Sequence, residues 1–483
     1  MRGLLRLKPL QIVVIASLLV LASIGLASAQ NPAYQTPFIT AITYQNVSSS
    51  TANVTFNFYA EGSGTPITIT PDPLPAGAGA YLYVGGLAQI PSNFSGAAVL
   101  SADQPVVATL VQIPQSTTVK NRPLSNGFSS ASSQVLIATV LKNKFNTTTK
   151  FSVQNAHSGP IDIKVQFFNA DNPAAPPIEL TATNIPSGSA KSYDLGQISE
   201  LGSVFNGSAI VTATAAGTST PANIVASALE LSTTGVEAKA FEGVNGGAKT
   251  VYMPSALCNA FGGQTSYYAV QNTSSTQSTN VTVTYSNGNT DNASIGPGKK
   301  ASFSGCNVNS ANFSGSATIT SDTTDIVVIG KVAGAGVSSA FLGETSGASK
   351  LALPYVRWSE TGYDNGTRQR TFIAIQNVGS GTVNNIQVKY LNKNGEVVGI
   401  HTISSLAPGA KANSWATQAT LQAGHTQNEL NEFGTPEGNP GGGYGGAVIV
   451  EGPSGSQLAA VARVASKVGS SLVAEDYNGI PVQ

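Results

Sequence analysis

The three histidines, His157, His401 and His425, have the widest chemical range in the chain, and they share no regular spacing. His425 lies four residues before Glu429, so a short helix would place both side chains on one face, as a metal pair requires. Glu432 follows in the same stretch. A solvated helical insertion in a long loop explains these residues equally well, so the sequence predicts no metal site.

Sequence motifs for catalysis are also missing. The chain contains no Gly-x-Ser-x-Gly and no Gly-rich phosphate loop ending in Lys-Ser/Thr. No acid/base pair or nucleophile stands out, so we predict that the protein is not an enzyme and binds no cofactor, a hydrolase being the weakest alternative. Asp291 and Asp364 lie in Asn/Gly-rich turns that could hold a structural Ca²⁺, but neither matches a calcium-binding loop.

Cys258 and Cys306 are the only cysteines, and an even count in an exported chain predicts one disulfide. Closing a loop of this length contributes about 4 kcal/mol in the chain-entropy model. Two free thiols remain an alternative, and so does a metal site, although no histidine lies near either cysteine in the sequence.

Ten Asn-x-Ser/Thr triplets are candidate glycosylation sites. Repeat inheritance and a high Ser/Thr content explain much of their number, so they are either acceptors or ordinary turn and strand residues. The triplets begin at Asn46, Asn53, Asn93, Asn146, Asn206, Asn272, Asn280, Asn292, Asn312 and Asn365.

Two tryptophans and a nearby tyrosine are candidate glycan contacts. Trp358, Trp415 and Tyr363 lie in the last third of the chain, and aromatic rings exposed on one face could stack on sugar rings. Partly buried packing residues are the alternative.

The N-terminus resembles an export signal. Arg2, Arg6 and Lys8 precede an apolar run, residues 12–26, which ends in the small-x-small triplet Ala27-Ser28-Ala29. The run is shorter than the ~20 residues that a bilayer requires, so a membrane anchor is the weaker interpretation. We expect the mature chain to begin at Gln30, to lie outside the cell and to contain no transmembrane span.

Charge excludes some classes of partner. Only 10% of the residues are charged, and 24 Lys+Arg balance 24 Asp+Glu. Because no strong field exists to attract nucleic acid, we predict no nucleic-acid partner. Ser, Thr, Asn and Gly occupy the polar positions instead, which favours strands and turns over helices.

A repeated pattern determines the predicted architecture. Gln-Asn closes an apolar run four times, and each time a second run of alternating residues follows, as in Val281-Thr-Val-Thr-Tyr285. Later landmarks recur in the same order: a Pro-x-Gly or Pro-Gly turn, an aromatic-x-Gly stretch such as Phe313-Ser-Gly-Ser-Ala317, and another apolar run. Each repeat holds about seven strands in roughly 100 residues, the size of a Greek-key β-sandwich.

The expected organisation is all-β, with four tandem immunoglobulin-like modules arranged as a semi-rigid rod. The predicted boundaries are a signal peptide at 1–29, module 1 at 30–128 without an opening strand, module 2 at 129–245, module 3 at 246–345 with the disulfide, and module 4 at 346–483 with a loop insertion at about 416–443. Aromatic-Gly pairs such as Phe241-Glu-Gly243 follow the last strand of each module and are interpreted as the start of short linkers.

These landmarks resemble tandem immunoglobulin-like modules of secreted bacterial surface proteins, such as the bacterial cell-adhesion-related domain and fibronectin type III-like arrays. The resemblance covers nearly all of the mature chain and implies a stalk, surface-layer component or adhesin. It implies no catalytic residues, and no recognisable wall-sorting signal accompanies it.

The sequence therefore favours an extracellular structural protein, a self-assembling subunit of a surface layer, sheath or filament. Strands such as Val281-Thr-Val-Thr and Ile326-Val-Val-Ile carry no Lys, so we expect edge pairing between subunits. The expected partners are other copies or other cell-surface components. The alternative is an adhesin or a carbohydrate-binding stalk.

Overall fold

The computed structural model describes residues 37–115, 119–172, 174–232, 237–361, 365–468 and 471–482, and antiparallel strands make up most of them. The expectation of an all-β chain is confirmed. The predicted signal peptide, Tyr363 and Asp364 lie outside the described residues. No helix in these ranges is long and apolar enough to cross a membrane.

The strands form eight sheets, two from each of four consecutive stretches of chain, which we call the first to fourth sheet pairs. In each pair we call the sheet that ends in β7, β15, β23 or β32 the inner sheet, and the other the outer sheet. The alternation of β10, where Ile161, Ile163, Val165 and Phe167 are buried between more exposed polar residues, shows why such sequences form half-buried strands.

The second sheet pair has the regular pattern. Its outer sheet has the order β11-β10-β13-β8 and its inner sheet the order β12-β9-β14-β15. The strands are β8 (Gln134–Lys142), β9 (Thr147–Asn155), β10 (Ile161–Asn169), β11 (Ile178–Ile185), β12 (Ala190–Asp194), β13 (Phe205–Ala215), β14 (Ile224–Ser232) and β15 (Ala238–Glu242), with 3-10 turns η2 (Leu195–Gln197) and η3 (Ser199–Leu201).

The third sheet pair repeats it, with orders β19-β18-β21-β16 and β20-β17-β22-β23. Its strands are β16 (Thr250–Cys258), β17 (Thr265–Asn272), β18 (Thr279–Tyr285), β19 (Thr290–Ile295), β20 (Lys300–Ser304), β21 (Phe313–Ser321), β22 (Ile326–Gly334) and β23 (Val337–Leu342).

The fourth sheet pair extends the pattern, with orders β29-β27-β26-β30-β24-β33 and β28-β25-β31-β32. Its elements are β24 (Lys350–Leu353), β25 (Asn365–Asn377), β26 (Val383–Asn392), β27 (Val397–Leu406), β28 (Lys411–Ser414), η4 (Ala416–Gln418), β29 (Thr420–Leu421), α2 (Gln427–Asn431), β30 (Gly446–Glu451), β31 (Leu458–Val468), β32 (Ser471–Asn478) and β33 (Ile480–Pro481).

The first sheet pair is shorter, with orders β3-β2-β5 and β4-β1-β6-β7. Among the described residues, no strand takes the place beside β5 that β8, β16 and β24 take in the other pairs. Its elements are β1 (Phe38–Asn46), β2 (Val54–Ala60), β3 (Pro66–Ile69), β4 (Gly79–Tyr83), η1 (Val84–Gly86), β5 (Gly96–Ala102), β6 (Val106–Pro114) and β7 (Leu124–Asn126).

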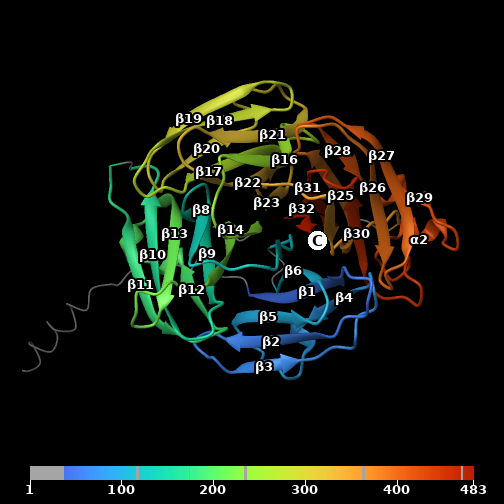
Figure 1. The fold of residues 1–483 in the computed structure, drawn as a ribbon, viewed down its shortest axis with the longest axis horizontal. Helices are drawn as coiled ribbons and strands as arrows, with labels where there is room; N and C mark the ends of the chain where they lie inside the picture. Colours follow the sequence, from blue (N-terminus) through green and yellow to red (C-terminus); the bar gives the residue numbers. More distant parts are fainter. Residues whose placement is uncertain are drawn as a thin grey trace, which may run out of the picture.

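The four sheet pairs form a closed ring, with the C-terminus near its centre (Figure 1). The strands β7, β15, β23 and β32 meet there, each in contact with two of the others. The expectation of a rod is therefore wrong. All four stretches interpreted as the start of linkers begin inside these strands, at Asn126, Phe241, Phe341 and Tyr477. They therefore join the pairs around one axis instead of spacing them along a line.

Each joint between neighbouring sheet pairs contains a hydrogen bond at or near the turn that follows β3, β11, β19 or β27. The Ser208 hydroxyl donates to the carbonyl of Gly298 at 2.7 Å, and the Ser316 hydroxyl donates to the carbonyl of Gly409 at 2.6 Å. The first and second pairs are joined from Gly62 N to Ser189 Oγ at 2.8 Å, and the fourth and first from Gly79 N to the carbonyl of Lys393 at 3.2 Å. The Pro-x-Gly turns thus contribute to docking as well as to chain reversal.

Candidate binding site at the first sheet pair

The opening strand has the same place in the second and third sheet pairs. Strand β8 lies at the edge of the outer sheet, and its cluster of buried residues includes Val327, Ile329 and Ala340 of the next pair. Likewise, β16 belongs to a cluster that contains Val461 and Ala465 of the fourth pair. Each opening strand therefore covers its own core and also the inner sheet of the following pair.

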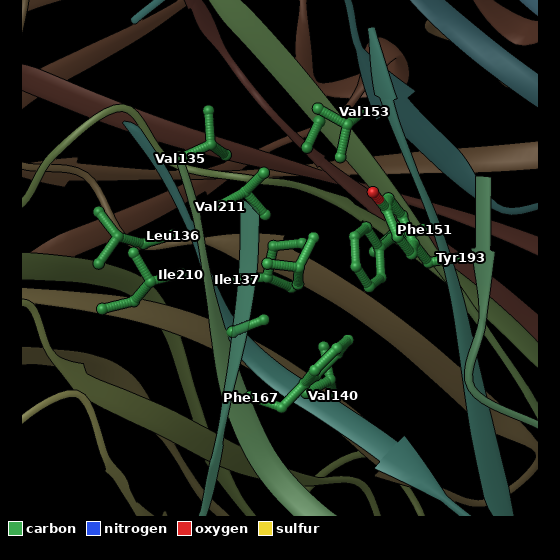
Figure 2. Packing of buried hydrophobic residues seen from close by; sticks show 14 of the residues in the cluster. Val135, Leu136, Ile137, Val140, Phe151, Val153, Phe167, Tyr193, Ile210 and Val211 are labelled. Carbon is green, nitrogen blue, oxygen red and sulfur yellow. The ribbon is translucent and has the colours of Figure 1, made fainter. Parts of the chain in front are cut away.

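Figure 2 shows how β8 fills its place. Val140 lies beside Phe167, whereas Leu136 and Ile210 lie together on the side away from Phe151 and Phe167. Val135 and Ile137 pair across the ladder with Val211 and Ala209, which face the core with them. The strand thus has apolar side chains on both faces.

At the first sheet pair the corresponding place is a cavity of about 920 Å³, which we call the strand slot. One wall is the apolar core of the first pair, including Phe56, Phe58 and Leu100. The opposite wall is the inner sheet of the second pair, including Ser152 and Ser227. The volume lies within the ~300–1,000 Å³ range of ligand sites.

The core next to the slot is less covered than its counterparts. Phe94, Ala98 and Leu100 are only partly buried, as are Val106, Ala108 and Leu110. The matching residues of the second pair, Phe205, Ala209, Val211, Ile224, Ala226 and Ala228, are all fully buried. This greater exposure of the first core is the effect expected where the strand that covers the other cores is absent.

The backbone of β5 presents groups to the slot that no described strand pairs with. Ser95 O accepts from Glu61 N and Asp103 N donates to Asn53 O, so the odd-numbered residues of this stretch bond toward β2. Because backbone groups alternate along an antiparallel strand, those of Ala98 and Leu100 point to the open edge. The strand contains no charged residue and no Pro that would protect this edge.

A second unusual feature is a group of buried carboxyls near the ring centre. Burial raises the pKa of Glu242 to about 7, and its Oε1 accepts from the backbone N–H of Asn126. Burial raises the pKa of Glu344 to about 7, and the nearby Glu242 adds to this effect. Asn478 donates to Glu344 at 2.5 Å and its carbonyl accepts from the Asn126 amide at 2.8 Å. These residues connect all four sheet pairs, because Asn126 lies in β7, Glu242 in β15 and Asn478 in β32, and Glu344 bonds to β16 through Tyr252.

Glu475 and Lys300 are further buried charges of the ring. Burial raises the pKa of Glu475 to about 8 and lowers the pKa of Lys300 to about 7. Although burial favours neutral Glu230, the ammonium of Lys331 at 2.7 Å holds its pKa below the ordinary value. Sequence reasoning missed these residues, although the scarcity of charge made Glu242 in Phe241-Glu-Gly243 conspicuous.

The histidines are not brought together. His401 Nδ1 lies 2.8 Å from Ser414 Oγ, and His425 Nδ1, two residues before α2, lies 2.8 Å from Glu429 Oε2 in the helix. Glu432 points elsewhere and accepts from Ser359 Oγ at 2.7 Å. The described residues contain no group of three His, Cys, Asp or Glu side chains that could hold a metal ion. Asp291 accepts from the Asn307 amide at 2.8 Å.

Cys258 and Cys306 form the predicted disulfide, with their Cα atoms 4.8 Å apart. The bond connects β16 of the outer sheet to the turn after β20 of the inner sheet.

Two candidate glycosylation sites are incompatible with this fold. Asn46 and Asn272 are fully buried, and the amide of each donates to several backbone carbonyls. Of the others, Asn206 is half-buried, the side chain of Asn365 is not described, and the exposed ones are Asn53, Asn93, Asn146, Asn280, Asn292 and Asn312.

Trp358 is not an exposed platform. Its side chain is 5% exposed. Its ring stacks on Trp415 with the ring centroids 6.5 Å apart, and Arg370 Cζ lies 5.0 Å from its ring centroid. Phe372 packs edge-on at 5.5 Å. A sugar could stack on Trp358 only if this cluster opened.

Comparisons with known proteins do not identify a family for this chain. No family model and no curated protein matches it. Among solved structures, a tetra-tandem repeat in the extending region of a large adhesion protein aligns over 91% of this chain and 94% of that chain at 12% identity. Its TM-score is 0.10, so the alignment carries no argument about fold or function.

Proposed function

We propose that the protein is an extracellular structural protein, a subunit of a surface layer, sheath or filament. The leader-like N-terminus and the Cys258–Cys306 disulfide support export, because disulfides persist in oxidising compartments. We infer further that the sheet pairs are immunoglobulin-like Greek-key modules, on the basis of the strand order that recurs in the second and third pairs.

The observation that carries the assembly role is the open edge of β5. The expectation of edge pairing at β18 and β22 is wrong, because both strands lie inside their sheets and are hydrogen-bonded on both sides. Within the described part of the chain, β5 pairs with β2 on one side and with no strand on the other. It has no charged residue to prevent further pairing. Assembly with other surface components would therefore occur at the first sheet pair.

The proposal is tested by expressing the chain with its N-terminal leader and fractionating the cells. We expect the exported protein to begin at Gln30 by mass spectrometry, to contain no free thiol, and to form higher-order assemblies visible by electron microscopy with cell-surface material. A cytoplasmic chain with reduced cysteines would contradict export. A concentration-independent monomer that never associates with surface material would contradict assembly.

A further inference from the structure

We propose that the strand slot accepts, in trans, an extended segment of another polypeptide, which adds to β5 as an antiparallel strand. The inference rests on the proposed export, because removal of residues 1–29 leaves seven residues, 30–36, before Pro37. The second pair uses nine residues for β8 and four more, 143–146, to reach β9. The predicted mature N-terminus is therefore too short to fill the slot in cis.

The other sheet pairs indicate the chemistry of the occupant. Strands β8, β16 and β24 show that an extended, mainly apolar segment belongs beside the strand equivalent to β5. The groups of β5 that face the slot, at Ala98 and Leu100, can pair with the backbone of any sequence, and the apolar core selects the side chains. This is the mode of strand addition, in which backbone bonds supply affinity and alternate side chains supply specificity.

The two walls require different side chains on the two faces of the occupant. The core wall, with Phe56, Phe58 and Leu110, requires apolar side chains at the positions that Val135 and Ile137 fill in β8. The opposite wall carries Ser152 and Ser227, at positions where the third pair has Ala269 and Ile329 and the fourth has Ala374 and Val461. The face toward this wall should therefore be small or hydroxyl-bearing.

A partner strand fits better than a second copy of this chain. The described apolar strands of the chain are already paired within their own sheets. Residues 30–36, Gln-Asn-Pro-Ala-Tyr-Gln-Thr, contain no apolar alternation and include a Pro, which cannot donate to a ladder. Residues 30–36 and the described strands of a second copy therefore offer no unpaired segment with the required pattern.

The experiment uses the exported chain and two synthetic peptides. The first has the sequence of Gln134–Lys142 with Leu136→Ser, so that the core-facing positions stay apolar and the wall-facing position is polar. The control peptide retains Leu136 and carries Val135→Ser and Ile137→Ser. We expect the first peptide to bind at least tenfold more tightly by fluorescence anisotropy and to slow hydrogen exchange at the amides of Ala98 and Leu100.

Variants of β5 test the site. Ala98→Pro removes an outward N–H without removing a bond to β2, and Pro is tolerated at sheet edges, so peptide affinity should fall at least tenfold while the melting temperature changes little. Val99→Ser, on the opposite face of β5, should bind as the unaltered chain does. Grafting residues 134–146 directly before Pro37 should fill the slot in cis, raise the melting temperature and abolish peptide binding.

Three outcomes would overturn the proposal. Equal binding of the two peptides, or no binding up to millimolar concentration, would show that the slot does not select a strand. Exchange protection of Ala98 and Leu100 at all protein concentrations would show that residues of the same chain cover β5. Protection that rises with protein concentration as a dimer forms would identify a second copy. Because purified protein is used, these results do not depend on where the protein resides in the cell.

Discussion

The Asn of each Gln-Asn pair has a structural role that extends beyond ending a strand. The Asn272 amide donates to the carbonyls of Gln277 at 2.6 Å and Ile295 at 3.1 Å, and its Oδ1 accepts from Ser274 N at 3.0 Å and Thr324 Oγ1 at 2.7 Å. Asn46, Asn155 and Asn377 make the same kind of bonds in the other pairs. The buried amide thus joins three segments that would otherwise leave polar backbone groups unpaired.

Substitution of this residue should destabilise the ring. We expect Asn272→Ala to lower the free energy of unfolding by roughly 3 kcal/mol, because buried carbonyl and N–H groups lose their partner. Urea denaturation followed by tyrosine fluorescence measures the change. Asn93→Ala, at an exposed Asn, is the matched control, and equal stability of the two variants would contradict the role assigned to Asn272.

At the scale of elements, the disulfide joins the two sheets of the third pair at one end. The cysteines are 48 residues apart in sequence; Cys258 ends β16 of the outer sheet, and Cys306 follows β20 of the inner sheet. Reduction should lower the free energy of unfolding by about 4 kcal/mol in the chain-entropy model. Denaturation with and without dithiothreitol measures this loss. In Cys258→Ala/Cys306→Ala the reductant should have no effect, and a reductant effect there would contradict the assignment.

Most strands were predictable, but the eighth strand of each complete pair was not. The alternation in Val281-Thr-Val-Thr-Tyr285 identifies β18 directly, because one face is buried and the other is solvated. Strand β15, Ala238–Glu242, is short, and in sequence it resembles a connection followed by Gly243. It becomes a strand because β14 and the ring centre cover it, a tertiary effect that local pattern does not encode.

The ring as a whole contains buried carboxyls whose protonation depends on its closure. A Glu pKa raised from 4.5 to about 7 in the folded state, as for Glu242 and Glu344, means that the folded protein binds more protons than the unfolded chain between these values. Stability must therefore fall as pH rises through this window. Glu475 acts in the same direction up to about pH 8. Lys300, with its pKa lowered to about 7, acts oppositely above that pH.

We therefore expect the protein to be more stable at pH 5 than at pH 7.5, and Glu242→Gln to remove part of that difference. The rise in the pKa of Glu242 corresponds to a change in the free energy of unfolding on the order of 3 kcal/mol for one isolated group. Urea denaturation at the two pH values measures the change. Glu179→Gln, at an exposed site of β11, should leave the pH dependence unchanged. The same pH dependence in Glu242→Gln as in the unaltered chain would contradict this account.

The strand slot was only partly predictable from the sequence, because one of its walls depends on the closure of the ring. The missing opening strand of the first repeat was visible as a gap in the pattern, because β8, β16 and β24 each precede a Gln-Asn strand. The opposite wall of the slot, with Ser152 and Ser227, comes from the second sheet pair and depends on the ring. A rod and a ring have the same local periodicity, so spacing along the chain could not distinguish them.

Three joints of the ring connect neighbours in sequence, whereas the joint between the first and fourth sheet pairs connects the two extremes of the chain. Ala352 and Ile449 of the fourth pair cover Val47 and Val107 of the first. During synthesis or export from the N-terminus, those valines stay exposed to water until β24 and β30 have emerged. Closure of the ring therefore requires strands from both ends of the described chain, and we expect this joint to form after the other three.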